Sequence, residues 1–125
     1  MSYDVEVYAQ RAMTARELVK TVKGDRELTA KGDRATGGVG EVEWKRSGEH
    51  CFNVDGPMEV DSDEIPEEWT GSTPPTVFYS IQVPYIVDTS AGFSFEADPR
   101  QLSAALGFAS RLAERLDGLV VDLQT

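Results

Sequence analysis

Cysteine and histidine are almost missing from this chain, in which Cys51 and His50 are the only residues of their types. A single cysteine forms no intrachain disulfide, so the class of small secreted proteins rich in disulfide bridges is excluded. One cysteine and one histidine also fall short of the common zinc ligand sets. Neighbouring side chains of a strand point to opposite faces, so we expect a buried Cys51 and no thiolate–imidazole pair.

Basic residues are missing from the middle of the chain. Residues 1–46 hold nine bases and eight acids, residues 100–125 hold three of each, and residues 47–99 hold eleven acids and no lysine or arginine. Such a field repels the phosphates of nucleic acids and of anionic lipids, and it attracts basic proteins or cations. We therefore predict no nucleic-acid partner and no membrane partner.

Membrane and export signals are missing as well. The longest uncharged run, between Glu68 and Asp88, is interrupted by prolines and polar residues that a membrane helix of that length does not carry. The N-terminal sequence MSYDVEVYAQ alternates acids with apolar residues and has no basic segment before an apolar run, so we expect no signal peptide and a mature chain that starts at or near Met1. The expected protein is cytoplasmic, with one domain over residues 1–125.

Hydrophobic periodicity predicts both strands and helices. The alternating segments predict strands at 3–8, 26–30, 39–46, 50–54, 76–83 and 119–123. Capping boxes at Thr14 and Glu17, and at Asp98 and Gln101, predict the starts of two helices. Gly24 is the expected left-handed stop of the first helix, Gly118 ends the second, and Asp55-Gly56-Pro57 is the expected turn after the fourth strand.

The order of these elements predicts an α+β fold. We expect an antiparallel or mixed sheet covered on one face by two helices, with a ferredoxin-like split arrangement as the first hypothesis. Three segments, YDVEVY near the start, DGPMEV in the middle and the leucine-rich helix that passes directly into DGLVVDLQT, also resemble small uncharacterised bacterial α+β proteins. The resemblance implies a fold, and it assigns no catalytic residue and no cofactor.

The stretch VDGPMEVDSDEIPEEW, residues 54–69, holds seven carboxylates in sixteen positions. An EF-hand loop needs glycine at its sixth position and glutamate at its twelfth, and no alignment of this stretch meets both conditions. A looser cation site formed by Asp61, Asp63 and Glu64 stays an alternative to a solvated loop, which is the usual state of a charged run. We predict no metal and no cofactor.

Catalytic motifs do not fit the rest of the chain. IVDTSAG, residues 86–92, has Ser90 where the aspartic-protease signature has glycine. KGDRATGGVG, residues 31–40, lacks the Gly-Lys-Ser/Thr ending of a phosphate-binding loop and predicts a mobile hairpin turn. FSF, residues 93–95, lacks the paired glycines of a nucleophile elbow. No catalytic residue is therefore assigned, and a non-enzymatic protein is favoured.

The leading hypothesis is a binding or adaptor domain whose acidic face, residues 55–69, engages a basic protein partner. Trp69 directly follows the last acid of this stretch and could serve as an aromatic anchor. An aromatic side chain surrounded by carboxylates binds arginine or lysine side chains. The residues assigned to this face are Glu59, Asp61, Asp63, Glu64, Glu67, Glu68 and Trp69.

Two alternatives stay open. The first is a small-molecule-binding protein or an enzyme with its site in the loops around Tyr85 and Asp88, together with Tyr79 and Gln82. The second is a homodimer in which an exposed strand, 26–30 or 119–123, pairs across a twofold axis.

Overall fold

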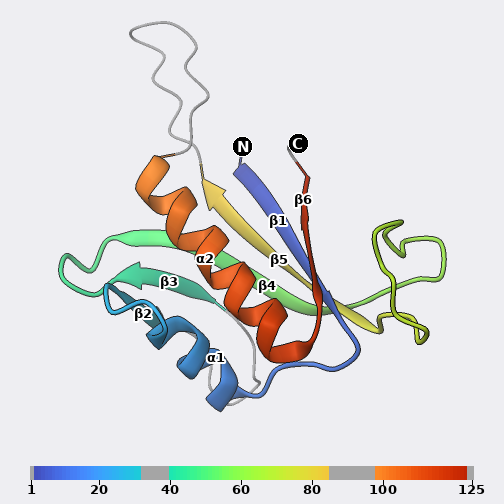
Figure 1. Ribbon diagram of the computed structural model, residues 1–125. Helices are drawn as coiled ribbons and strands as arrows, with labels where there is room; N and C mark the ends of the chain where they lie inside the picture. Colours follow the sequence, from blue (N-terminus) through green and yellow to red (C-terminus); the bar gives the residue numbers. More distant parts are fainter. Residues whose placement is uncertain (1, 32–39, 85–97, 124–125) are drawn as a thin grey trace, which may run out of the picture.

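The computed structural model describes residues 2–31, 40–84 and 98–123 (Figure 1). Strands and helices follow one another in the order β1, α1, β2, β3, β4, β5, α2, β6. Their bounds are β1 (Ser2–Ala9), α1 (Ala15–Lys23), β2 (Leu28–Lys31), β3 (Glu41–Trp44), β4 (His50–Glu59), β5 (Val77–Pro84), α2 (Pro99–Leu116) and β6 (Leu119–Asp122). All six predicted strands and both predicted helices are present, with ends that differ by a few residues.

The six strands form one antiparallel sheet in the order β2-β3-β4-β5-β1-β6, and both helices lie on the same face of it (Figure 1). The α+β prediction is therefore confirmed. The ferredoxin-like split arrangement is not confirmed. α2 connects β5 to β6, and these two strands lie on either side of β1, as a split unit requires. α1, however, connects β1 to β2, which lies at the far edge of the sheet. Both segments predicted for dimer pairing form edge strands.

Period-two alternation places the core between the sheet and the helices. Val5 and Val7 of β1 lie opposite Ile81 and Tyr79 of β5, and all four side chains are fully buried. Phe108 of α2 packs against this face and against Phe52 of β4, with ring centroids 5.4 Å apart. Burial of each large apolar side chain contributes about 1.5–3 kcal/mol, so this layer supplies most of the stabilisation of the fold.

The first helix begins as predicted and ends differently. Glu17 N donates to Thr14 Oγ1 (3.1 Å) and Thr14 N donates to Glu17 Oε1 (3.0 Å), which confirms the capping box. The predicted left-handed stop is wrong, because Gly24 has φ −58° and ψ −22°. Arg111 Nε of α2 donates to Thr21 O (2.9 Å), so a side chain from the second helix satisfies a carbonyl in the last turn.

The second helix also differs from its prediction at both ends. Asp98 Oδ1 accepts from Arg100 N (2.8 Å), as a cap should, but Gln101 Nε2 donates to His50 O (3.0 Å) and does not complete a capping box. That bond ties the start of α2 to the start of β4. At the other end the helix stops at Leu116, and the left-handed residue is Asp117 (φ 53°), one position before the predicted stop.

Strand β4 continues through the predicted turn at Asp55-Gly56-Pro57, so that prediction is wrong. The pairing of β4 with β5 shifts between Asp55 and Met58, as in a bulge. Gly56 has φ 129°, and a Cβ there would lie 2.9 Å from Phe78 O. The glycine therefore lets the backbone pass close to β5, and the strand bends without ending.

The two helices lie in the part of the chain that the structure describes. No helix there has both the length and the apolar character that a crossing requires.

Candidate functional site

The acidic segment, which we define as residues 55–69, begins in β4 and continues into the loop that follows it. This loop reaches the end of the molecule where α2 stops, and the start of α2 lies at the opposite end (Figure 1). Three hydrogen bonds fasten the loop to the end of β1: Thr76 N to Ala9 O (2.9 Å), Gln10 Nε2 to Thr73 O (2.8 Å) and Thr76 Oγ1 to Gln10 O (2.8 Å). The eighteen residues of α2 separate the two ends by about 27 Å.

Three acids of this segment converge in space. One carboxylate oxygen each from Asp61, Asp63 and Glu64 lies within 4.8 Å of the other two, and all three side chains are exposed. A hydrogen bond with Asp61 and a partial loss of hydration raise the pKa of Glu64 above its ordinary value. The negative charges of Asp61, Asp63 and Glu6 raise it further, in that order. These acids therefore repel one another in the folded chain.

A neighbouring tyrosine on the sheet reports the same negative field. Tyr8 lies on the face of β1 that the helices leave uncovered, where it stacks on Phe78 with ring centroids 5.3 Å apart. Burial, the charge of Glu6 and a hydrogen bond to Glu6, followed by the charge of Glu64, raise the pKa of Tyr8 to about 12. The acidic field therefore extends from the loop onto the uncovered face of β1.

A cation such as Ca²⁺ would contact these carboxylates, since oxygen ligands are what it prefers. The candidate ligands are Asp61, Asp63 and Glu64, the same three residues that the sequence offers. Exposed acidic groups are common without an ion. The arrangement therefore shows a set of possible ligands, and the absence of a metal stays a prediction.

Trp69 follows the acids at the same end of the molecule. A hydrogen bond from Trp69 N to Pro66 O (3.1 Å) closes the turn that carries Glu67 and Glu68, and both carboxylates are exposed. The half-buried indole lines a hollow of about 380 Å³, which we call the Trp69 hollow. Its other lining residues are Gln10, Glu68, Thr70, Gly71, Ser72, Thr73, Asp117, Gly118 and Leu119.

The structure therefore gathers the predicted face into two groups. Asp61, Asp63 and Glu64 form one cluster, and Glu68 lies beside Trp69 in the hollow. The other two predicted acids, Glu59 and Glu67, are exposed and belong to neither group. Asp117 was missed, because its place at the end of α2 signals a helix stop and gives no sign that Trp69 is near.

Two of the four residues of the alternative ligand site, Tyr79 and Gln82, belong to the described residues. Tyr85 and Asp88 lie outside the described residues. Tyr79 is fully buried on the helix-covered face, where its hydroxyl accepts from Met13 N (2.9 Å). Gln82 lies on the opposite face of β5, and its Nε2 donates to Ser80 Oγ (3.3 Å). Tyr79 and Gln82 therefore line no common site.

Cys51 is fully buried, as predicted. Burial raises the pKa of its thiol to about 12, and the charges of Asp25 and Asp98 act in the same direction while that of Arg100 opposes them. A thiol with so high a pKa stays protonated at neutral pH and is a poor nucleophile. The neighbouring His50 is half-buried, and its backbone carbonyl binds Gln101.

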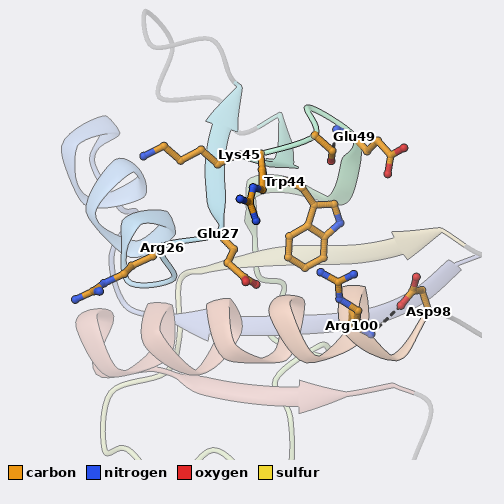
Figure 2. Close-up of a pocket in the computed structure, with 9 residues that line it drawn as sticks. Arg26, Glu27, Trp44, Lys45, Glu49, Asp98 and Arg100 are labelled. Carbon is orange, nitrogen blue, oxygen red and sulfur yellow. Dashed lines mark hydrogen bonds between the residues drawn. The ribbon is translucent and has the colours of Figure 1, made fainter.

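A larger hollow, of about 790 Å³, lies where α2 begins (Figure 2). We call it the Trp44 hollow, and sequence analysis missed it because its lining comes from the α1–β2 connection, the β3–β4 turn and the start of α2. The guanidinium of Arg100 lies against the Trp44 ring, 5.2 Å from its centroid. The residues that line the Trp44 hollow are Arg26, Glu27, Trp44, Lys45, Arg46, Ser47, Glu49, Asp98 and Arg100.

The charges of the Trp44 hollow are mixed. Four bases and three acids line it, and in Figure 2 the side chains of Arg26 and Lys45 point away from the Trp44 ring. The ring already has a cation from its own chain, Arg100. A surface with both signs of charge and an occupied aromatic face selects neither a cation nor an anion, so this hollow carries no functional assignment.

Comparison with known proteins adds no assignment. No protein-family model matches the chain, and no curated protein matches it. The structure itself defines an α+β domain with an acidic, aromatic-lined end, and the function is inferred from those residues.

Proposed function

We propose that this protein is a non-enzymatic binding or adaptor domain that engages a basic protein partner through the acidic segment. The observation that carries the proposal is the gathering of exposed carboxylates at one end of the molecule. Within the described residues, no ion pair joins a base to any of the six predicted acids: Glu59, Asp61, Asp63, Glu64, Glu67 and Glu68.

Mutual repulsion gives this surface a reason to bind bases. A hydrogen bond with Asp61, a partial loss of hydration and the charges of neighbouring carboxylates raise the pKa of Glu64. A lysine or arginine placed among them by a partner would relieve that repulsion. A field of one sign also accelerates the encounter with a basic protein, and it does so less at high salt.

The surface is held in place before any partner arrives. The hydrogen bonds of Gln10 and Thr76 anchor the loop to the end of β1, and Trp69 Nε1 donates to Thr73 O (2.9 Å) within the loop. Less ordering is then needed on binding, and that favours affinity.

Capture from a host lysate tests the proposal. The immobilised protein should retain a basic protein at about 50 mM salt and release it at about 500 mM, where the Debye length is much shorter. A variant with all six acids changed to Gln or Asn should lose the captured protein. Retention by that variant equal to wild type would overturn the proposal.

A matched pair of variants separates position from net charge. The first neutralises four acids of the segment, and the second neutralises four exposed acids elsewhere, so both gain four charge units. Capture should fall with the first and stay with the second. The two sets are Glu59, Asp61, Glu67 and Glu68 in the segment, and Glu27, Glu41, Glu49 and Glu114 elsewhere.

The cytoplasm is the proposed location. The single cysteine, Cys51, supports this location, because proteins of a reducing compartment rarely contain disulfide bonds. Fractionation of the host, with detection of the native protein, tests this point.

A further inference from the structure

The Trp69 hollow has the components of a cation site and no cation of its own. Its lining residues include Trp69, Glu68 and Asp117, and among the described residues they include no lysine or arginine. The Trp44 ring offers a comparison within the same chain, because there Arg100 places its guanidinium 5.2 Å from the ring centroid. No base of the described residues has a corresponding contact with Trp69.

The negative groups of the hollow come from two separate elements. Glu68 lies in the turn closed by Trp69 N and Pro66 O, and Asp117 is the left-handed residue that follows α2. Because the carbonyl end of a helix carries partial negative charge, the end of α2 adds to the field of the two carboxylates. The loop and the end of the helix therefore each bring an acidic residue to the lining of one hollow.

The aromatic wall is fixed in position. Trp69 Nε1 donates to Thr73 O (2.9 Å), and Gln10 Nε2 donates to the same oxygen (2.8 Å). Gly71 lies so close to the indole that a Cβ on it would be 3.0 Å from Trp69 Nε1. The loop thus wraps the edge of the ring and leaves the ring as part of a preformed hollow.

The bases that are near in sequence are committed elsewhere or point elsewhere. Arg11 follows Gln10, but its two terminal nitrogens each bind a carboxylate oxygen of Glu17 at 2.8 Å. One of them also donates to Arg115 O (3.4 Å). Neither Arg11 nor Arg115 lines the Trp69 hollow. No base of the described residues therefore fills the hollow, which leaves it open to a cation from another molecule.

We propose that the Trp69 hollow binds one arginine side chain of the basic partner, with its guanidinium against the Trp69 indole and between Glu68 and Asp117. This inference rests on the proposed function, because the partner provides the arginine. Arginine fits better than lysine, since its planar guanidinium stacks on an aromatic ring, loses hydration more readily and presents several donors in a fixed geometry to two carboxylates.

A titration followed by NMR tests the inference with defined probes. The probes are three acetylated and amidated pentapeptides, Gly-Gly-X-Gly-Gly, in which X is arginine, lysine or uncharged citrulline. The chain has two tryptophans, so two indole N–H signals report on Trp44 and Trp69. Peptide is added to about 10 mM, because a single exposed contact of this kind binds in the millimolar range.

The arginine peptide should shift the Trp69 indole signal and leave the Trp44 signal in place. Its dissociation constant should be about threefold lower than that of the lysine peptide and about tenfold lower than that of the citrulline peptide. Equal affinities for arginine and lysine, or a shift confined to Trp44, would overturn the inference.

Variants locate the contact. Asp117→Asn keeps a residue that tolerates the left-handed backbone and removes the charge, so it should weaken arginine-peptide binding by about threefold. Trp69→Phe should weaken it by a similar factor and leave the backbone spectrum folded. Glu114→Gln is the control, since it removes an exposed charge from α2 outside the hollow. Binding that falls equally in the control and in Asp117→Asn would show a general charge effect and contradict the inference.

A hexalysine peptide separates this inference from the proposed function. Hexalysine should bind at low salt and lose binding when the six acids of the segment are neutralised. If it does so while the arginine peptide shows no preference for the Trp69 hollow, the inference fails and the proposed function stands. If neither hexalysine nor the arginine peptide binds, both proposals fail. Binding of hexalysine together with an arginine-selective shift at Trp69 supports both.

Discussion

At one end of α2 the Trp44 ring lies against the guanidinium of Arg100, and at the other end Trp69, Glu68 and Asp117 line one hollow. The first end has charges of both signs, and its aromatic ring is paired within the chain. The second has charges of one sign around an aromatic ring that no base of the described residues covers. We therefore expect the hollow of larger volume to be the less selective one, because selectivity follows the sign and the pairing of the charges.

Two glutamates show the same contrast in their titration. Glu17 is hydrogen-bonded to Arg11 and to the backbone of Thr14, and these partners lower its pKa to about 2. Glu64 has Asp61 and other acids as neighbours, and its pKa is raised. A carboxylate that is paired with a base of the same chain stabilises the fold at neutral pH. A carboxylate that lies among other carboxylates destabilises the fold at that pH, and a basic partner can reduce the repulsion.

The largest expected effect on stability comes from a substitution between α2 and β6, at the end of the molecule that carries the acidic segment. A Cβ at position 118 would overlap the backbone oxygen of Tyr8, so Gly118→Ala must displace the α2–β6 connection. We expect the free energy of unfolding to fall by about 2–3 kcal/mol, measured by chemical denaturation.

Gly24→Ala is the matched control for that prediction. There the new Cβ would meet Nε and Cδ of the Arg111 side chain, at 2.5 and 2.6 Å, and a side chain can turn away where a backbone cannot. We expect a loss of about 1 kcal/mol, the worth of the hydrogen bond from Arg111 to Thr21 O. Equal losses in the two variants would contradict the distinction.

Glu17→Gln sharpens the comparison through pH. The variant should lose about 1 kcal/mol at pH 7, from the capping box and from an ion pair whose Arg11 partner is half exposed. Because the folded pKa of about 2 lies below the ordinary value of 4.5, the stabilisation is present above pH 4.5 and is lost as the pH falls toward 2. Denaturation curves of the two proteins should therefore converge over that range, and a constant difference would refute the assignment.

Arg100→Ala tests the paired ring. Removal of the guanidinium from the Trp44 face should lower the free energy of unfolding by about 0.5–1 kcal/mol and change the tryptophan fluorescence. Arg115→Ala, an exposed arginine near the other end of α2, should change stability by less than about 0.5 kcal/mol. An equally large loss in Arg115→Ala would remove the special role given to the Trp44 contact.

The smallest effect is expected from Glu64→Gln, and it has the opposite sign. At neutral pH the variant should melt slightly higher than wild type, because one of the mutually repelling charges is gone. A raised folded pKa means that wild type gains stability as the pH falls through that pKa, so the advantage of the variant should disappear in acid. Melting curves at several pH values check this, with Glu41→Gln on β3 as an exposed control that should not change.

Local patterns predicted the elements because each was set by its own residues. The alternation of Val77, Tyr79, Ile81 and Val83 and the leucine stripe of α2 each identify an element without any neighbour. The errors occur where another part of the chain decides. β4 passes through Gly56 because β5 lies beside it, and Gly24 stays right-handed where Arg111 of α2 bonds to the last turn of α1. Gln101 likewise bonds to His50 of β4 instead of capping its own helix.

The candidate site divides along the same line. The acids of residues 59–68 and Trp69 lie close together in the chain, so the sequence could name them as one candidate face. Which of them gather in space depends on the fold. The approach of Asp117 to Trp69 depends on where α2 ends relative to the loop, and the Trp44 hollow depends on three connections that meet only in the folded protein. Neither has a signal in the sequence.

Site-specific photo-crosslinking at the two ends tests the central claim most directly. A photoreactive amino acid replaces Ser62 in the acidic segment or Ser47 in the Trp44 hollow, two exposed serines that leave every charge in place. The basic partner retained at low salt should be crosslinked from position 62 and not from position 47. Crosslinking from position 47 alone would show that the partner binds at the opposite end, and the acidic segment would then be a solvated loop.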